Sequence, residues 1–265
     1  MENCSIRRLA SISGYSASKL KRIKNDWLEK SPADIPIIHP FKYLILDGTY
    51  FHKDGCLMTI MHAIDQLILS NRYVPKEGFY VAIRWFKDLK DNGLNPMAVT
   101  SDGERSTLKA LLQIWPHITV QRCLYHIQHE GCRWLRTYPK TQAGRELRKL
   151  LLGLTKIRSV KERNQFMAQY KAWLKQHRTF VLSLPMHIKA NFDLKRTITL
   201  INNALPDMFH YLMDPNIHPT TNALEGWHSR IKRAYRQHPG LLQRNKIQFL
   251  KWYSFYENQQ KTNKK

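Results

Sequence analysis

Runs of apolar and β-favouring residues dominate one stretch of the chain and predict its first strands. They fall at 43–50 (YLILDGTY), at 56–65 (CLMTIMHAID) and near 67–74 (LILSNRYV). Short bounded runs of this composition are typical of strands. Asp54-Gly55, between the first two runs, is a hairpin-turn signal, so we expect these two strands to pair antiparallel.

The next stretch alternates between helical and strand-like periodicity. An amphipathic helix is predicted over 78–92, ended by Gly93, and a short buried strand over 96–101. A helix over 104–115 and a strand over 118–123 follow. Three antiparallel strands and then helix, strand, helix, strand is the element order of a ribonuclease H-like fold. We therefore expect an α/β chain with a mixed (α+β) sheet.

Beyond this core the pattern changes to helical and basic without strand-like runs. It predicts an all-α insertion over 127–204 that divides the core into a first part, 43–126, and a completing part, 205–265. A helix beginning near Thr220 and a basic, aromatic-rich C-terminal helix belong to the completing part.

The N-terminal segment reads as two helices with a tight turn. Ser16 is a plausible N-cap and Gly14 supplies the turn, in the spacing of a helix-turn-helix, which we place at 1–30. A proline-rich linker over 31–42 follows. DNA-binding candidates on its second helix are Lys19, Lys21 and Arg22. The alternative is an ordinary helical hairpin with a solvated basic face.

The net charge of the chain predicts a polyanionic partner. The 265 residues carry 43 Lys and Arg against 20 Asp and Glu, a net +23. The excess is concentrated in 127–200 and 226–265, whereas 43–126 is nearly neutral and 201–225 is acidic. A basic surround about an acid-bearing centre is expected of a metal-dependent enzyme that acts on nucleic acid.

Other compositional features indicate whether the chain folds and in which cellular compartment it is expected. The apolar fraction of 43% argues against global disorder, and there is no apolar run long enough to span a bilayer. The four cysteines include no CxxC pair and do not form a disulfide framework. We expect an intracellular protein without membrane association, in the bacterial cytoplasm and associated with the nucleoid.

Three acids stand out by position. Asp47 interrupts an apolar strand, where a lone carboxylate is costly to bury unless it is paired, in a turn or bound to a cation. Asp102 follows a strand at its carboxyl end, although it could instead cap a helix. Glu225 lies in the first turn of a basic helix, where it could simply complement the helix dipole.

Together these acids can bring three oxygen ligands to one point. Carboxylate oxygens suit Mg²⁺ or Mn²⁺. Two such ions can activate an attacking water or 3′-hydroxyl and stabilise the departing oxygen in phosphodiester displacement. The acids therefore predict a two-metal site for Mg²⁺ or Mn²⁺.

Four stretches carry a family resemblance. LDGTYF, SDGERS, QRCLYHI and TTNALEGWHSRIKR, with HPGL shortly after, resemble the motifs of DDE-type insertion-sequence transposases of the Mutator-like group. The resemblance implies metal-ligand roles for Asp47, Asp102 and Glu225, and places Cys123 and His126 near the active site and the DNA. It also implies a ribonuclease H-like catalytic domain with a helical insertion, and strand cleavage with transfer at element ends.

The spacing of Cys123, His126, His129 and Cys132 raises the question of zinc. On one helix, nine residues rotate Cys132 about half a turn away from Cys123, so all four cannot hold one tetrahedral ion. A local structural or DNA-proximal role for Cys123 and His126 is favoured, with structural zinc and plain packing as alternatives.

The helix of the third acid offers further candidates. Asn222 lies one turn from Glu225 and could orient its carboxylate or contact DNA. Trp227 would pack in the core or act as a stacking wedge on a splayed base. Four basic residues suit phosphate contacts: Arg230, Lys232, Arg233 and Arg236.

The leading hypothesis is a transposase that cleaves and transfers DNA strands, acting as at least a dimer on DNA because two element ends must meet. One alternative is a non-catalytic DNA-binding protein derived from a truncated or repurposed transposase. Another is a ribonuclease H-like nuclease that cuts RNA in hybrids.

Overall fold

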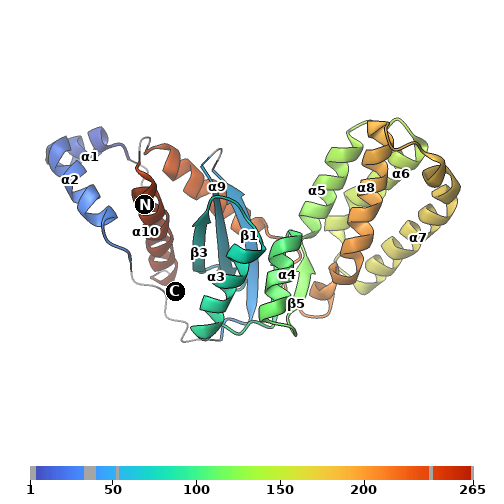
Figure 1. Cartoon of the computed structure of the whole chain (residues 1–265), viewed down its shortest axis with the longest axis horizontal. Helices are drawn as coiled ribbons and strands as arrows, with labels where there is room; N and C mark the ends of the chain where they lie inside the picture. Colours follow the sequence, from blue (N-terminus) through green and yellow to red (C-terminus); the bar gives the residue numbers. More distant parts are fainter. Residues whose placement is uncertain (1–3, 33–39, 52–53, 239–240, 264–265) are drawn as a thin grey trace.

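A five-stranded mixed sheet forms the centre of the chain (Figure 1). The computed structural model describes residues 4–32, 40–51, 54–238 and 241–263. Most of the predicted linker, residues 33–39, lies outside these ranges, as do residues 239–240 of the HPGL stretch. The strands are β1 (Tyr43–Tyr50), β2 (Cys56–His62), β3 (Ile68–Val74), β4 (Ala98–Ser101) and β5 (Thr119–Arg122).

The strand order in the sheet is β3-β2-β1-β4-β5. β1 and β2 are antiparallel, as are β2 and β3, while β4 runs parallel to both β1 and β5. The predicted hairpin is confirmed: Gly55 has φ +129° and its carbonyl accepts a hydrogen bond of 2.8 Å from the Phe51 N–H. The mixed α/β class is therefore confirmed as well.

Helices cover both faces of the sheet, and the alternation along β1 decides which residues meet them. Leu44 and Leu46 belong to a core with α3 (Phe79–Asp91) and α4 (Arg105–Ile114). Ile45 belongs to the opposite core, with α9 (Asn222–Arg236) and α10 (Gln243–Thr262). Successive side chains of a strand point to opposite faces, so Asp47 points to the same side as Ile45, toward α9.

Residues 124–204, all of them described, form helices and build a core of their own beside the sheet (Figure 1). Leu147, Tyr170 and Ile201 are central to it. A capping box of Ser159 and Glu162 starts its longest helix. The elements are α5 (Leu124–Leu135), α6 (Gln142–Gly153), η1 (Leu154–Lys156), α7 (Val160–Ser183) and α8 (Lys189–Ala204), followed by η2 (Leu205–Asp207) and η3 (His210–Leu212).

The N-terminal segment forms α1 (Ile6–Ser13) and α2 (Ala17–Leu28). As predicted, Gly14 adopts a left-handed conformation, φ +70°, and the Ser16 side chain caps α2 by accepting from the Lys19 N–H. Several large apolar side chains of this hairpin stay exposed. Trp27 is 48% exposed and packs edge-to-face on Trp252 of α10 at 4.6 Å, so the hairpin contacts the end of the chain. In the part of the chain that the structure describes, no helix combines the length and apolarity needed to cross a membrane.

Candidate active site

Asp47 is a buried carboxylate with a specific partner. It is 7% exposed, and its Oδ2 lies 3.4 Å from Nδ1 of His228 on α9. Nε2 of His228 lies 3.1 Å from Oγ1 of Thr59, which faces Asp47 across the β1–β2 pair. Asp47 thus lies within the strand rather than in a turn, and His228, itself held by Thr59, offsets part of the cost of burying the carboxylate.

Asp102 lies beside Asp47 because of strand register. Leu46 and Ser101 are the last partners in the parallel β1–β4 pair, so Asp102, directly after β4, lies next to Asp47, which continues β1. Asp102 Oδ1 accepts a hydrogen bond of 3.0 Å from the Glu104 N–H. The cap of α4 is Glu104, which accepts from the Ser106 and Thr107 N–H groups, so helix capping does not account for Asp102.

The two aspartates interact electrostatically. Burial raises the pKa of Asp102, and the negative charge of Asp47 raises it further, while the hydrogen bond from Glu104 opposes the shift. The charge of Asp47 therefore makes ionisation of Asp102 less favourable. A nearby cation would relieve this repulsion.

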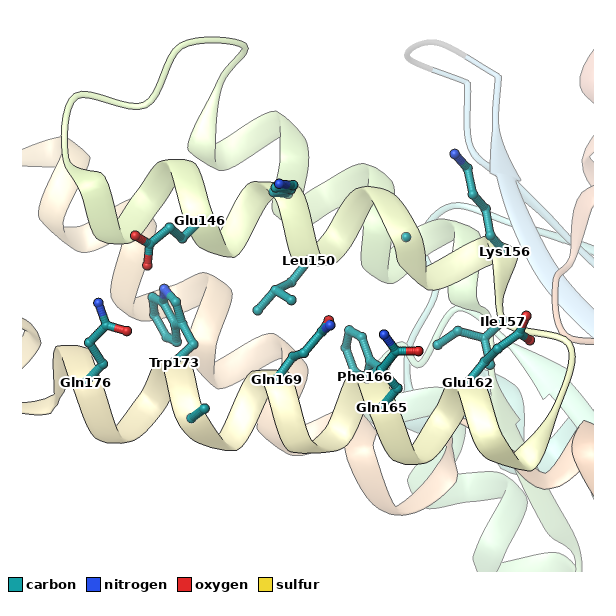
Figure 2. A pocket seen from close by; sticks show the side chains of 13 residues that line it. Glu146, Leu150, Lys156, Ile157, Glu162, Gln165, Phe166, Gln169, Trp173 and Gln176 are labelled. Atoms are coloured by element: carbon teal, nitrogen blue, oxygen red, sulfur yellow. The ribbon is translucent and has the colours of Figure 1, made fainter.

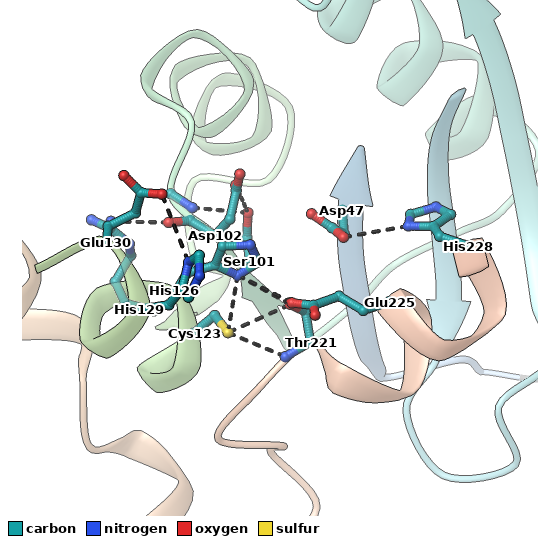
Figure 3. A network of polar contacts seen from close by, with 12 residues as sticks. Asp47, Ser101, Asp102, Cys123, His126, His129, Glu130, Thr221, Glu225 and His228 are labelled. Atoms are coloured by element: carbon teal, nitrogen blue, oxygen red, sulfur yellow. Dashed lines mark hydrogen bonds and ion pairs between the residues drawn. The ribbon is translucent and has the colours of Figure 1, made fainter. Parts of the chain in front are cut away.

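Glu225 reaches the same region from the first turn of α9. Figure 3 shows it between Asp47 and the pair formed by Cys123 and His126. Its Oε1 lies 3.6 Å from Nδ1 of His126 and accepts a hydrogen bond of 3.4 Å from Oγ1 of Thr221. The structure thus brings the three sequence-predicted acids to one end of the sheet.

Cys123 and His126 tie α5 to the start of α9. The buried Cys123 Sγ lies 3.3 Å from His126 Nδ1 and accepts a hydrogen bond of 3.3 Å from the Thr221 N–H. Burial opposes protonation of His126, but the hydrogen bond to Cys123 and the negative charges around it raise its pKa to about 9. His126 therefore carries a positive charge beside Glu225 at neutral pH.

Among the described residues, no group of three or more His, Cys, Asp or Glu side chains is close enough to hold a metal ion. The zinc alternative for the Cys/His stretch consequently gains no support. The three acids also do not form a closed ligand set; what fits a divalent cation is their chemistry as carboxylates and the repulsion between Asp47 and Asp102.

Glu77 is a fourth acid that sequence reasoning missed. It lies between β3 and α3, and its Oε1 accepts a hydrogen bond of 3.0 Å from Cys56 Sγ. A Cβ on Gly48 would lie 1.4 Å from that oxygen, so the carboxylate occupies the space above the glycine that follows Asp47. Burial raises the pKa of Glu77, with smaller contributions from the charges of Asp102 and Asp47. The available signal was a glycine inside a strand, which often marks close approach by another group.

Within the described ranges, Trp227 and Asn222, both predicted to support the active site, form no hydrogen bond to its acids. Trp227 is fully buried against Tyr253 in the core between β1 and α10, so the packing alternative holds and a stacking wedge is wrong. Asn222 is exposed, and Thr221, not Asn222, hydrogen-bonds to Glu225.

The basic residues predicted to bind DNA differ in how free their charges are to contact a ligand. Arg230 is paired with Glu257 at 2.6 Å, so much of its charge is neutralised. Lys232 is half-buried, and burial lowers its pKa. The side chains of the remaining five are exposed: Lys19, Lys21, Arg22, Arg233 and Arg236.

Two hollows lie outside the acidic site. One, of about 580 Å³, runs between α6 and α7 and is lined by Gln169, Trp173 and Gln176 among others (Figure 2). The other, of about 750 Å³, lies between the core and α8. None of Asp47, Asp102 and Glu225 lines either hollow.

Comparison with known proteins gave one family. A family model described as Transposase, Mutator family, matches residues 14–241, which is well over half of the chain. A search of curated proteins found no match.

Proposed function

Since the chain belongs to the Mutator family of transposases, we propose that it catalyses metal-dependent cleavage and transfer of DNA strands. The observation that carries the proposal is the meeting of Asp47, within β1, and Asp102, directly after the parallel neighbouring strand β4, with Glu225 supplied by α9. We further propose a ribonuclease H-like catalytic core interrupted by the helical segment, because the order β3-β2-β1-β4-β5 agrees with the element order of that fold.

Asp47, Asp102 and Glu225 would hold Mg²⁺ or Mn²⁺, whose ligands of choice are carboxylate oxygens. When bound, two such ions activate a water or a 3′-hydroxyl for attack on a phosphodiester and stabilise the departing oxygen. These residues fit a divalent cation for two reasons. Their donor atoms are carboxylate oxygens, and a cation would relieve the repulsion between the buried carboxylates of Asp47 and Asp102.

The chain's own side chains then have distinct tasks. His228 holds the Asp47 carboxylate from α9, and the Glu104 N–H holds one oxygen of Asp102. Protonated His126 adds a positive charge near Glu225 and so favours an anionic phosphate at this end of the sheet. Cys123 acts through His126 as a positioning residue.

DNA is the proposed partner, held by exposed cations. The hairpin of α1 and α2 would act as a helix-turn-helix, with Lys19, Lys21 and Arg22 on its second helix, while Arg233 and Arg236 contact phosphates. Because transposition joins two element ends, we expect at least a dimer on DNA. Association with the bacterial nucleoid stays a prediction of the same proposal.

The decisive experiment incubates the protein with DNA that carries the ends of its element, in Mg²⁺ or Mn²⁺. Asp47→Asn, Asp102→Asn and Glu225→Gln should each lower strand cleavage by about a hundredfold or more, as losses of electrostatic stabilisation commonly do. Asp91→Asn, an exposed acid at the end of α3, is the matched control and should cleave normally.

Cleavage that persists unchanged in all three variants refutes the assignment. Salt-sensitive DNA binding without metal-dependent cleavage would instead identify a non-catalytic DNA-binding protein. Preference for the RNA strand of a hybrid would identify a ribonuclease H-like nuclease.

A further inference from the structure

The second hollow lies at the junction of the sheet with the helical segment, where α4 and β5 meet α5 and α8 (Figure 1). Its volume is about 750 Å³. From the core it is lined by Gly103 and Arg122, and from the helical segment by Trp134 and Lys195, among others. Because Gly103 follows Asp102 directly, the hollow opens beside the acidic site.

Arg122 is the buried cation of this hollow. It is 8% exposed, and its Nη2 donates a hydrogen bond of 3.0 Å to the backbone carbonyl of Asp102. A Cβ on Gly103, which has φ +91°, would lie 2.0 Å from the Arg122 Cζ, so the guanidinium rests directly on the glycine backbone. Its Nε, buried, has no hydrogen-bond partner within the described ranges. A buried guanidinium with an unmet N–H favours an anionic acceptor.

The other cations differ in how far they are already engaged. Arg196 is held in place by Asp193 at 2.7 Å and by the face of Trp134 at 4.1 Å. Lys195 donates one hydrogen bond of 2.9 Å to the Leu184 carbonyl, which leaves two of its three N–H donors for a ligand. Arg105, in the first turn of α4, is exposed. Arg105, Arg122 and Lys195 therefore face the hollow from both sides of the junction.

We propose that this hollow binds a backbone phosphate of a single DNA strand, next to the phosphate positioned at the acids. The inference rests on the proposed function and adds the residues that hold the strand: Arg105, Arg122 and Lys195. The volume is in the range of small-ligand pockets and admits a phosphate with its neighbouring sugar. Arg122 would join the two sites, because it contacts both the hollow and the backbone of Asp102.

The test measures binding of a labelled twelve-nucleotide oligothymidylate to the full chain in EDTA, over a series of salt concentrations. The variant is Arg105→Gln with Lys195→Gln, since Arg122 also supports Asp102 and its loss would be ambiguous. The matched control removes the same charge from exposed positions of α7, Lys171→Gln with Arg178→Gln. A single-stranded contact contributes about 0.7 to the slope of log affinity against log salt, so the double variant should lose about 1.4 in slope and roughly tenfold in affinity.

Three outcomes separate the possibilities. A control that stays within about twofold of wild type, together with the loss in the variant, supports the proposal. If the double variant and the control bind the oligonucleotide with equal affinity and equal salt dependence, the proposal is overturned. Thymidine monophosphate that competes as well as the oligonucleotide also overturns it, because the hollow would then be a site for a free nucleotide.

The assay stands apart from the catalytic proposal because it needs neither metal nor cleavage. Strand binding that depends on the hollow, in a protein that cleaves no DNA, leaves this inference intact and refutes the catalysis. If the protein cleaves DNA but the double variant and the control bind the oligonucleotide alike, the catalytic proposal is supported and this inference is refuted.

Discussion

Gly48 offers a direct test of the fourth acid. A methyl group at this position would lie 1.4 Å from Oε1 and 2.7 Å from Cδ of Glu77, and 3.2 Å from Sγ of Cys56. The carboxylate is the far end of a flexible side chain, so in Gly48→Ala it should rotate away. The change then removes the hydrogen bond between the Cys56 thiol and Glu77, which measures 3.0 Å.

The size of the effect follows from that one interaction. A hydrogen bond to a charged acceptor contributes about 1.5–3 kcal/mol, so Gly48→Ala should lower the free energy of unfolding by about 2 kcal/mol. In a Glu77→Ala background the conflict with the carboxylate is absent, and only the 3.2 Å approach to Sγ of Cys56 remains. There the same substitution should cost less than about 0.5 kcal/mol, because alanine suits a strand better than glycine does.

Urea unfolding of the wild type, the two single variants and the double variant forms a closed cycle that isolates this coupling. Gly153→Ala, at a helical glycine with no heavy atom within 4 Å of the added Cβ, is the control and should be neutral or stabilising. If Gly48→Ala lowers the free energy of unfolding by the same amount with and without Glu77, the reasoning is refuted.

Three further predictions concern the core and the titrating groups. Trp227→Ala should lower the free energy of unfolding by about 3–5 kcal/mol, because the indole is fully buried; a loss under about 1 kcal/mol in urea unfolding would contradict its position. In metal-free Asp47→Asn, the pKa of Asp102, measured by carboxyl NMR, should fall from its raised value as one source of repulsion is removed, and an unchanged pKa would rule out the coupling. Because the pKa of His126 is raised from 6.5 to about 9, its stabilising contribution is complete below pH 6.5 and is lost as the pH rises through about 9. The stability difference between wild type and His126→Asn should accordingly shrink between pH 7 and pH 10, and a constant difference would count against the charged form.

Local patterns were sufficient to place the strands and the first two acids. Apolar runs marked β1, β2 and β4 within two or three residues, because a buried strand must be apolar along its length. The proximity of Asp47 and Asp102 follows from the parallel register of β1 and β4, since Asp102 comes directly after β4, beside Asp47 within β1.

Residues whose role depends on distant partners could not be found this way. Glu77 lies in a polar loop and resembles a solvated side chain until Gly48 and Cys56 are brought against it. Trp27 belongs to the N-terminal hairpin, but its aromatic partner, Trp252, is more than two hundred residues away in the chain. Periodicity reports which face is apolar and does not report what covers it.

The contacts of Cys123 explain how a helical segment of such length can be inserted without separating the third acid from the first two. Its thiol accepts the Thr221 N–H, and the Leu124 N–H donates to the Pro219 carbonyl at 2.9 Å, so the chain leaves and re-enters the core at adjacent points. The helices between these points bury their own apolar residues and need nothing from the sheet for their core. Glu225 lies in the first turn of α9, directly after the re-entry, and its carboxylate accepts a hydrogen bond of 3.4 Å from Oγ1 of Thr221. The position of the third acid therefore depends on the hydrogen bonds that join Cys123 and Thr221, which are 98 positions apart in the chain, rather than on the fold of the helical segment between them.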